Sequence, residues 1–195
     1  ANIGGDPKWS KKVVIFDENM MTHVINGFPN LTAVTREIPP IYMGSVMRQD
    51  GILHYLDAAE EYGVPSDVCP MPAGELGLAI EDDYPQVGCC IIHCNTTCDG
   101  SLMGNGIEDR RFDVPTFELA VPIRYLDEET KDYAAQEIKN CIKFIEDTTG
   151  EKFEWEAYFK AMHTFNEETR LLLEWLDVSK TDYPQVVGNN VAPYR

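Results

Sequence analysis

The stretch that decides the fold is Gly88-Cys-Cys-Ile-Ile-His-Cys-Asn-Thr-Thr-Cys-Asp-Gly100, in which an apolar run leads directly into a polar turn. A short apolar run without alternation is typical of a strand buried on both faces, as in a parallel sheet. Four of the six cysteines lie in this stretch. Because parallel α/β sheets build ligand sites at the carboxyl ends of their strands, thiols after this strand lie where a ligand is expected.

Strand-like and helix-like segments alternate around this stretch. Short β-prone runs occur at residues 12–16, 31–35 and 116–122. Apolar residues at three- and four-residue steps predict helices over 41–62 (with a possible break at Asp50-Gly51), 73–80, 127–150 and 155–178, and 101–110 could form a crossover helix. The alternation predicts an α/β fold: a Rossmann-like three-layer sandwich with a mainly parallel sheet, followed by two long helices.

The predicted segments also suggest a domain organisation. We expect residues 1–40 to be a lead-in with short strands and residues 41–195 to form the Rossmann-like domain. Prolines 70 and 72 are expected to bracket a turn after Cys69. The last predicted helix has an apolar stripe formed by Tyr158, Phe159, Met162, Phe165, Leu172 and Leu176.

Charge and composition exclude several classes of protein. The chain has 33 acidic and 16 basic residues, a net charge of −17. Such a surface repels phosphate backbones, so we expect no nucleic-acid partner. No apolar run reaches the roughly 18 residues of a membrane span, and no charged-then-apolar leader pattern is present, so we expect a cytoplasmic protein without membrane contact. Six irregularly spaced cysteines are more typical of free thiols or metal ligands than of a disulfide scaffold.

The cysteines differ in their local sequence. Cys89 and Cys90 lie in the apolar strand and Cys141 on the inner stripe of a helix, so these three are expected to be core residues. Cys94 closes the strand and fits either role. Cys69 and Cys98 stand beside Asp, Pro and Gly in predicted turns, where packing alone gives little reason for a thiol. Three thiolates with an open fourth position suit a 4Fe-4S cluster, although buried packing is the commoner fate of a free cysteine.

Other residues near this edge carry weaker signals. His93 is expected to be a hydrogen-bonded core histidine, and for Glu75 an exposed position is the simpler interpretation. Arg110, Arg111 and Arg124 follow a helix and a strand; they could receive phosphates, while a solvated or ion-paired state is the simpler reading. The sequence contains no P-loop, GxGxxG or GxSxG motif, which disfavours nucleotide hydrolysis, dinucleotide binding and serine hydrolysis.

Six motifs follow one another along the chain: Asp67-Val-Cys-Pro-x-Pro-Ala-Gly-Glu75, Asp82-Asp-Tyr-Pro85, Asn95-Thr-Thr-Cys-Asp-Gly-Ser101, Glu108-Asp-Arg-Arg-Phe112, Leu119-Ala-Val-Pro-Ile-Arg-Tyr125 and Phe144-Ile-Glu-Asp-Thr-Thr-Gly-Glu-Lys-Phe153. In this order they resemble the 2-hydroxyacyl-CoA dehydratase / benzoyl-CoA reductase family, with the larger subunit of 2-hydroxyglutaryl-CoA dehydratase-like enzymes as the most similar type. The resemblance covers roughly residues 41–195.

This resemblance implies an oxygen-sensitive heterodimer whose subunits each hold a 4Fe-4S cluster on three cysteines. It implies as partners a second dehydratase subunit, an ATP-dependent iron-sulfur activator that supplies one electron, and an acyl-CoA substrate that loses its 2-hydroxyl group through a ketyl radical anion. Cys69 and Cys98 match the first two ligand positions. The family's third ligand lies in a second domain, so we expect it outside this segment and expect the chain to be part of a longer subunit. The alternatives are that Cys94 substitutes as the third ligand or that this segment holds no cluster by itself.

Two other functions share this pattern of residues. A benzoyl-CoA-type reductase subunit has the same fold and ligands but reduces a ring. A non-catalytic subunit would relay electrons or support the active partner. A zinc- or thiol-containing acidic binding domain is a further alternative, unrelated to this family.

Overall fold

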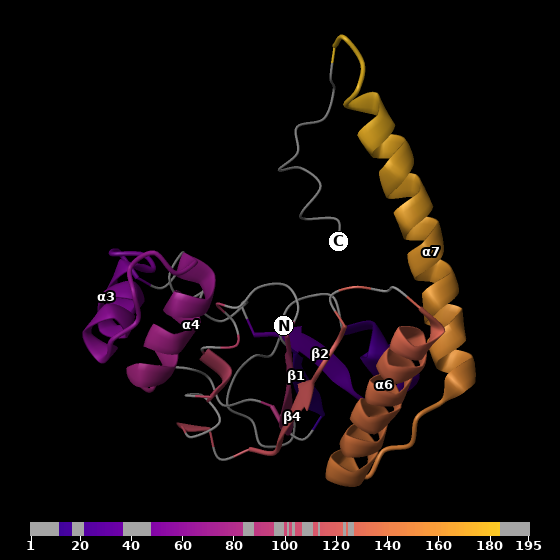
Figure 1. Ribbon diagram of the computed structural model, residues 1–195, viewed down its shortest axis with the longest axis horizontal. Coiled ribbons are helices and arrows are strands. Elements are labelled where there is room, and N and C mark those ends of the chain that lie inside the picture. The colour runs from indigo at the N-terminus through magenta and orange to yellow at the C-terminus, as the bar shows by residue number, and fades with distance from the viewer. Residues whose placement is uncertain are drawn as a thin grey trace.

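A four-stranded parallel sheet lies at the centre of the molecule (Figure 1). This computed structural model describes residues 12–16, 22–36, 48–83, 88–95, 100, 102, 104–106, 111–112, 114–122, 124 and 127–183. The strands are β1 (Val13–Phe16), β2 (Thr32–Thr35), β3 (Cys90–Cys94) and β4 (Thr116–Leu119), in the order β2-β1-β3-β4. All three pairings are parallel, with Ile15 opposite both Val34 and Ile91. The sheet therefore includes two strands from the segment 1–40.

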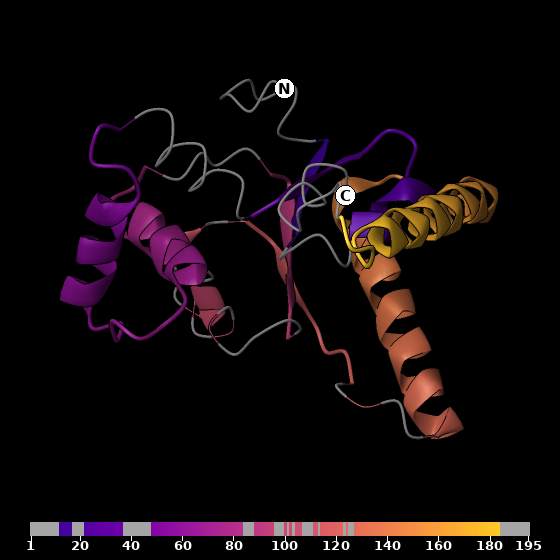
Figure 2. The ribbon, with the colours of Figure 1, turned by 90° about the horizontal axis from the view of Figure 1, so that it is seen from above.

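Alternate residues of the central strands supply two separate cores. Val14 and Phe16 of β1 pack with Cys90 and Ile92 of β3 on one face, which we call the α6 face. Ile15 and Ile91 pack on the other, the α4 face. Since successive side chains of a strand point to opposite faces, both faces of this sheet must be covered. Figure 2 shows the cover: α3 and α4 lie on one side of the sheet and α6 on the other.

Helices α3 (Leu53–Tyr62) and α4 (Pro70–Ile80) form the layer on the α4 face and pack tightly against each other. A Cβ atom built on Gly77 would lie 1.8 Å from the backbone oxygen of Tyr55, so only glycine permits this approach. Helix α3 ends at Gly63, whose φ of 114° allows its N–H to bond to the carbonyls of Ala59 and Glu60.

The break that the sequence allowed at Asp50-Gly51 is confirmed: a turn precedes α3, which begins at Leu53, and residues 41–47 lie outside the described part. One prediction in this region needs correction. Pro70 and Pro72 do not bracket a turn. They lie in the first turn of α4, where a missing N–H costs nothing, and Cys69 is the N-cap residue.

Helix α6 (Glu128–Thr149) covers the opposite face through Cys141, Ile142 and Ile145. It begins where the sequence predicted: the Asp127 carboxylate accepts hydrogen bonds from the Thr130 N–H and hydroxyl, at 2.9 and 2.6 Å. It ends at Gly150, with φ of 76°. The first of the two long helices is thus itself the third layer of the sandwich, and the α/β Rossmann-like prediction is confirmed.

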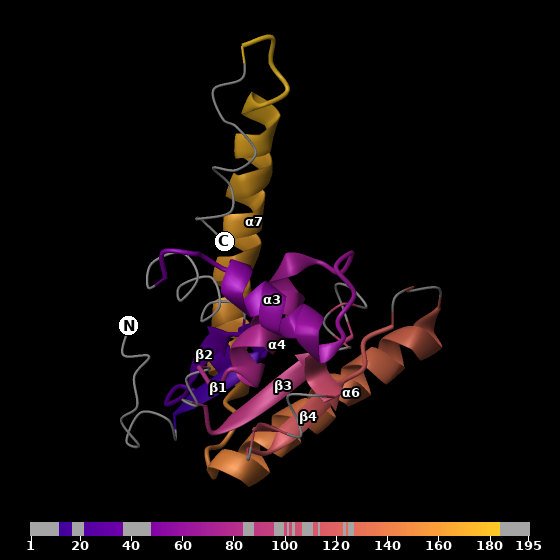
Figure 3. The ribbon, with the colours of Figure 1, turned by 90° about the vertical axis from the view of Figure 1, so that its left-hand side faces the viewer.

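Helix α7 (Trp155–Val178) extends away from the sheet (Figures 1 and 3). It packs on the 3-10 turn η1 (Thr22–Gly27), where the His23 and Phe165 rings lie 4.0 Å apart. The half-buried stripe includes Tyr158, Met162, Phe165 and Leu172, close to the prediction. No residue of α7 is fully buried, and Phe159 and Leu176, predicted for the stripe, are exposed. Within the described part of the chain, no helix has the length and apolarity needed to cross a membrane.

Candidate functional site at the carboxyl edge of the sheet

The carboxyl edge of the sheet is the place where the topology favours a ligand. From β1 the chain passes to β2 on one side, and from β3 it passes to β4 on the other, so the order reverses between the two central strands. Open α/β sheets bind ligands at such a switch point. The described residues at this edge include Arg36 after β2, Asn95 after β3 and Val121 after β4.

Cys69 lies on the same side of the molecule as this edge. The opposite end of α4 is held near the amino end of β4 by Arg111, which donates hydrogen bonds to the carbonyls of Ala79 and Ile80, each at 2.8 Å. The N-terminus of α4 therefore points toward the carboxyl edge. The Cys69 thiol is free and exposed, and its residue has the extended backbone of an N-cap.

A buried polar network lies beneath the edge on the α4 face. We call it the Arg36 network, and it consists of Arg36, Glu75, His93 and Asn105. The Arg36 Nε atom lies 3.0 Å from Glu75 Oε2, and Arg36 Nη1 lies 3.1 Å from His93 Nδ1 and 2.8 Å from Asn105 Oδ1. All four residues are at most 6% exposed. Because a guanidinium only donates, Nδ1 of His93 accepts, and a neutral His93 carries its proton on Nε2.

The network corrects one sequence interpretation and confirms another. Glu75 is 2% exposed rather than solvated, because Arg36 pairs with its carboxylate and compensates for its burial. His93 is the hydrogen-bonded core histidine that the sequence predicted. Sequence reasoning missed Arg36 and Asn105. The available signal for Arg36 was its position directly after a β-prone run, which places it at the carboxyl edge of a parallel sheet.

The remaining described thiols belong to the interior or to the opposite edge. Cys90 and Cys141 are fully buried in the α6-face core, as predicted. Burial, together with the neighbouring Cys94, raises the pKa of Cys141 to about 12, so it stays a neutral thiol. A hydrogen bond with Cys89, whose Sγ lies 4.0 Å away, and burial raise the pKa of Cys90. The prediction of a core position is wrong for Cys89, which precedes β3, is only half-buried and donates to the Val13 carbonyl at 3.1 Å.

Cys94 is 1% exposed, and strand alternation places its side chain on the α6 face with Cys90 and Ile92. Cys69 belongs to the layer on the other face. Within the described residues, no group of three or more His, Cys, Asp or Glu side chains could hold a metal ion. Cys98 and Arg110 lie outside the described residues, as do Ser101, Met103 and residues 107–109 of the predicted crossover helix; the described residues 100, 102 and 104–106 are helical.

A hollow of about 880 Å³ opens at the carboxyl end of β4, between Asn95, Val121, Arg124 and the first turn of α6. Asn95 fixes its wall: Nδ2 donates to the Val121 carbonyl at 2.9 Å, and Oδ1 accepts from the Val121 N–H at 2.7 Å. Arg124 is exposed beside the hollow, where the sequence placed it. The Asp127 carboxylate already satisfies the N-terminus of α6, and these hydrogen bonds hold its pKa below the usual value.

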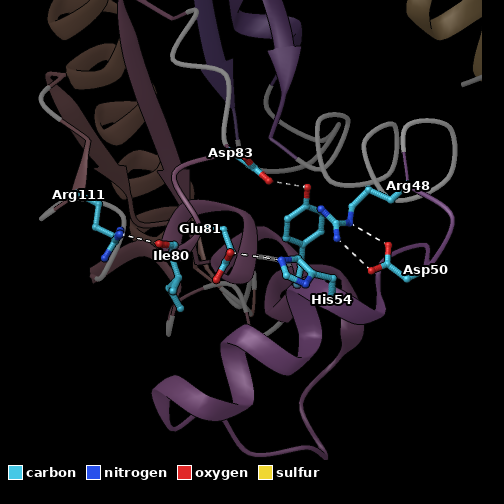
Figure 4. A network of polar contacts seen from close by, with 8 residues as sticks. Arg48, Asp50, His54, Ile80, Glu81, Asp83 and Arg111 are labelled. Carbon is cyan, nitrogen blue, oxygen red and sulfur yellow. Dashed lines mark hydrogen bonds and ion pairs between the residues drawn. The ribbon is translucent and has the colours of Figure 1, made fainter.

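A second polar network lies at the other edge, around the start of α3 and the end of α4 (Figure 4). Arg48 and Asp50 form a bidentate pair at 2.9 and 3.0 Å, Tyr55 donates to Asp83 at 3.1 Å, and Arg111 holds the α4 carbonyls. Arg111 therefore does not serve the carboxyl edge. It joins the end of α4 to the approach to β4, and its ion pair with Asp82, at 3.4 Å, is the ion-paired state that the sequence allowed.

Fold and edge together define a class of protein: a parallel, doubly wound α/β domain with an exposed thiol and a buried guanidinium at its ligand edge. Residues 37–194 match the model of a protein family described as 2-hydroxyglutaryl-CoA dehydratase, D-component, and the chain belongs to that family. The description as one component implies a partner component. A search of the curated proteins found no match to this chain.

Proposed function

We propose that this chain is part of the cluster-bearing subunit of a 2-hydroxyacyl-CoA dehydratase. The observation that carries the proposal is the free, exposed Cys69 thiol at the ligand edge of a domain that belongs to a dehydratase family. The substrate loses its 2-hydroxyl group and a β-proton as water, and an enoyl-CoA remains. A second subunit and an ATP-dependent iron-sulfur activator complete the system.

In this proposal Cys69 and Cys98 are ligands of a 4Fe-4S cluster, and further ligation comes from outside the described residues. The donor chemistry fits at Cys69, because its thiol is free and exposed, so it is accessible to an incoming metal cluster. When bound, the cluster supplies an electron at very low potential. Cys90 and Cys141 do not fit a ligand role, since both are buried as neutral thiols in a closed apolar core.

The hollow at the end of β4 fits one part of the proposed acyl-CoA substrate. Among the described residues that line it, Arg124 is the only cation, and it stands exposed where it can receive a phosphate group. The Asn95–Val121 pair keeps this wall fixed to β3. The net charge of −17 makes such a local cation important, because the rest of the surface repels an anionic substrate.

An activity measurement tests the proposal. The subunit that contains this chain is purified without oxygen together with its partner component, then mixed with activator, ATP and a 2-hydroxyacyl-CoA, and enoyl-CoA is followed by mass spectrometry. We expect product from the wild type, none from Cys69→Ser or Cys98→Ser, and wild-type rates from Cys89→Ser. Cys89→Ser is the matched control because a serine hydroxyl can still donate to the Val13 carbonyl.

The same assay separates the alternatives. Reduction of an aromatic acyl-CoA with no elimination of water would assign the chain to a ring reductase. Full activity of both Cys69→Ser and Cys98→Ser would show that this chain only supports its partner, and the proposal would be abandoned.

A further inference from the structure

The Arg36 network connects the two segments that carry the proposed ligands. Arg36 Nη1 donates to His93, which precedes Cys98 by five residues, and to Asn105, which follows Cys98 by seven. Arg36 Nε faces the Glu75 carboxylate, six residues after Cys69 on α4. One guanidinium thus contacts the chain on both sides of Cys98 and the helix that begins at Cys69.

The geometry of these contacts makes Arg36 unusually constraining. It follows β2 directly, and its own N–H donates to the Phe16 carbonyl at 2.8 Å, which fixes its backbone to β1. A planar guanidinium holds its nitrogen atoms in a fixed arrangement, so His93 on β3, Glu75 on α4 and Asn105 are held at set relative positions. Six residues of helix place Glu75 about 9 Å from Cys69 along the axis of α4.

Burial of this network calls for a reason other than stability. A buried ion pair is often no more stable than apolar residues of the same volume, because both charges lose their hydration. The neighbouring core of α3 and α4 is filled by Ala59, Val64, Ala73 and Leu76, which shows that apolar residues suit this layer. Asn105 Nδ2 is also buried and finds no acceptor among the described residues. Because burying these polar groups is costly, their presence is better explained by the relative positions of the chain segments that they hold.

We propose that Arg36 is the positioning residue of the carboxyl edge: it holds the helix that begins at Cys69 in register with His93 and Asn105, the described residues on either side of Cys98, before any cluster is present. This inference rests on the proposed function for the roles of the two cysteines. It does not require Arg36 to touch the cluster or the substrate.

Two readouts test the inference, and the first needs no iron. In the iron-free chain, Cys69 and Cys98 are cross-linked with a short bis-maleimide, and the yield of the linked peptide pair is measured by mass spectrometry. We expect a high yield in the wild type and a low yield in Arg36→Met/Glu75→Met, a double variant that leaves no unpaired buried charge. Circular dichroism and Tm establish that the double variant is folded.

The second readout is the amount of iron that the protein binds. Loss of groups that orient metal ligands typically lowers metal affinity roughly 10- to 100-fold, and we expect a loss of that order in the double variant on anaerobic reconstitution. Arg36→Lys keeps the charge but loses the fork, so it should fold and show the same defects. The control is Arg170→Met/Glu167→Met, which removes an exposed arginine–carboxylate pair on α7 and should change neither readout.

The outcomes separate this inference from the proposed function. A wild type that cross-links efficiently but binds no iron would overturn the proposed function and leave the positioning role standing. A folded Arg36→Lys with wild-type cross-linking and iron content would overturn the positioning role. If the double variant fails to fold, the cross-linking yield and iron content of Arg36→Lys alone test the positioning role.

Discussion

At the scale of single residues, the environment of His23 disfavours the charged, protonated form of its ring. Its ring is tilted by 46° against the Phe165 ring, with the ring centroids 4.0 Å apart, where η1 meets α7. Burial lowers the pKa of His23 below 6.5, while the nearby Glu168 opposes the shift only in part. The folded state therefore binds this proton less tightly than the unfolded state does.

This residue makes stability depend on pH. Above about pH 6.5 the ring is neutral in both states; below it the unfolded state binds more protons, so stability falls until pH drops below the folded pKa. We expect Tm of the wild type to decrease between pH 7 and pH 5, and to decrease less in His23→Phe, which retains the ring contact. An equal decrease of Tm in the wild type and in His23→Phe would show that His23 does not contribute to the pH dependence of stability. Carboxylates with lowered pKa values, such as Asp50 and Glu146, act only at lower pH.

At the scale of elements, the α3–α4 contact depends on one missing side chain. Gly77→Ala would place a Cβ atom 1.8 Å from the Tyr55 carbonyl oxygen, and the helices would have to separate. Overpacking of this kind costs about 1–3 kcal/mol, so we expect a clear loss of unfolding free energy by urea titration.

Gly106→Ala is the matched control for Gly77→Ala. Gly106 is exposed and helical, and its added Cβ would meet no atom within 4 Å. Alanine in such a position stabilises a helix by about 0.5–1 kcal/mol. A Gly77→Ala variant as stable as Gly106→Ala would mean that the two helices are less closely packed than described here.

The same region shows why sequence reasoning succeeded in part. Apolar periodicity located α3, α6 and α7, and the caps at Gly63, Asp127 and Gly150 follow from local backbone chemistry. Glycine is a poor helix former, yet Gly77 permits the close approach of α4 to the Tyr55 backbone and Gly74 leaves room for the Ile52 side chain, which no local pattern reveals. The network of Arg36 and Glu75 was likewise missed because the two residues lie 39 positions apart and meet only in the fold.

At the scale of the whole molecule, burial is uneven. Every residue of β3 is buried, whereas the C-terminal half of α7 exposes Leu171, Leu173 and Val178. Two motifs behind the family resemblance meet far from the ligand edge: Asp82 and Arg111 lie 3.4 Å apart at the amino edge. Motif order thus indicated the family correctly without indicating which motifs form the site.

This unevenness predicts a gradient of local stability. Amide hydrogen exchange should be slowest in β1 and β3 and fast in residues 169–178 of α7, because few buried contacts hold the end of that helix. Exchange is measured by mass spectrometry on the isolated chain. Protection of residues 169–178 equal to that of β3 would show that this end of α7 is covered in solution.

We propose that Cys69 and Cys98 hold an iron-sulfur cluster at the carboxyl edge of this sheet, and the proposed function depends on this cluster. The most direct test of this proposal is the iron and acid-labile sulfide content of the anaerobically purified subunit, compared with Cys69→Ser, Cys98→Ser and Cys89→Ser. We predict equal iron and sulfide in the wild type and in Cys89→Ser, and a loss of most of both in the other two variants. A colourless, iron-free wild type, or full iron content in Cys69→Ser and Cys98→Ser, would contradict the account.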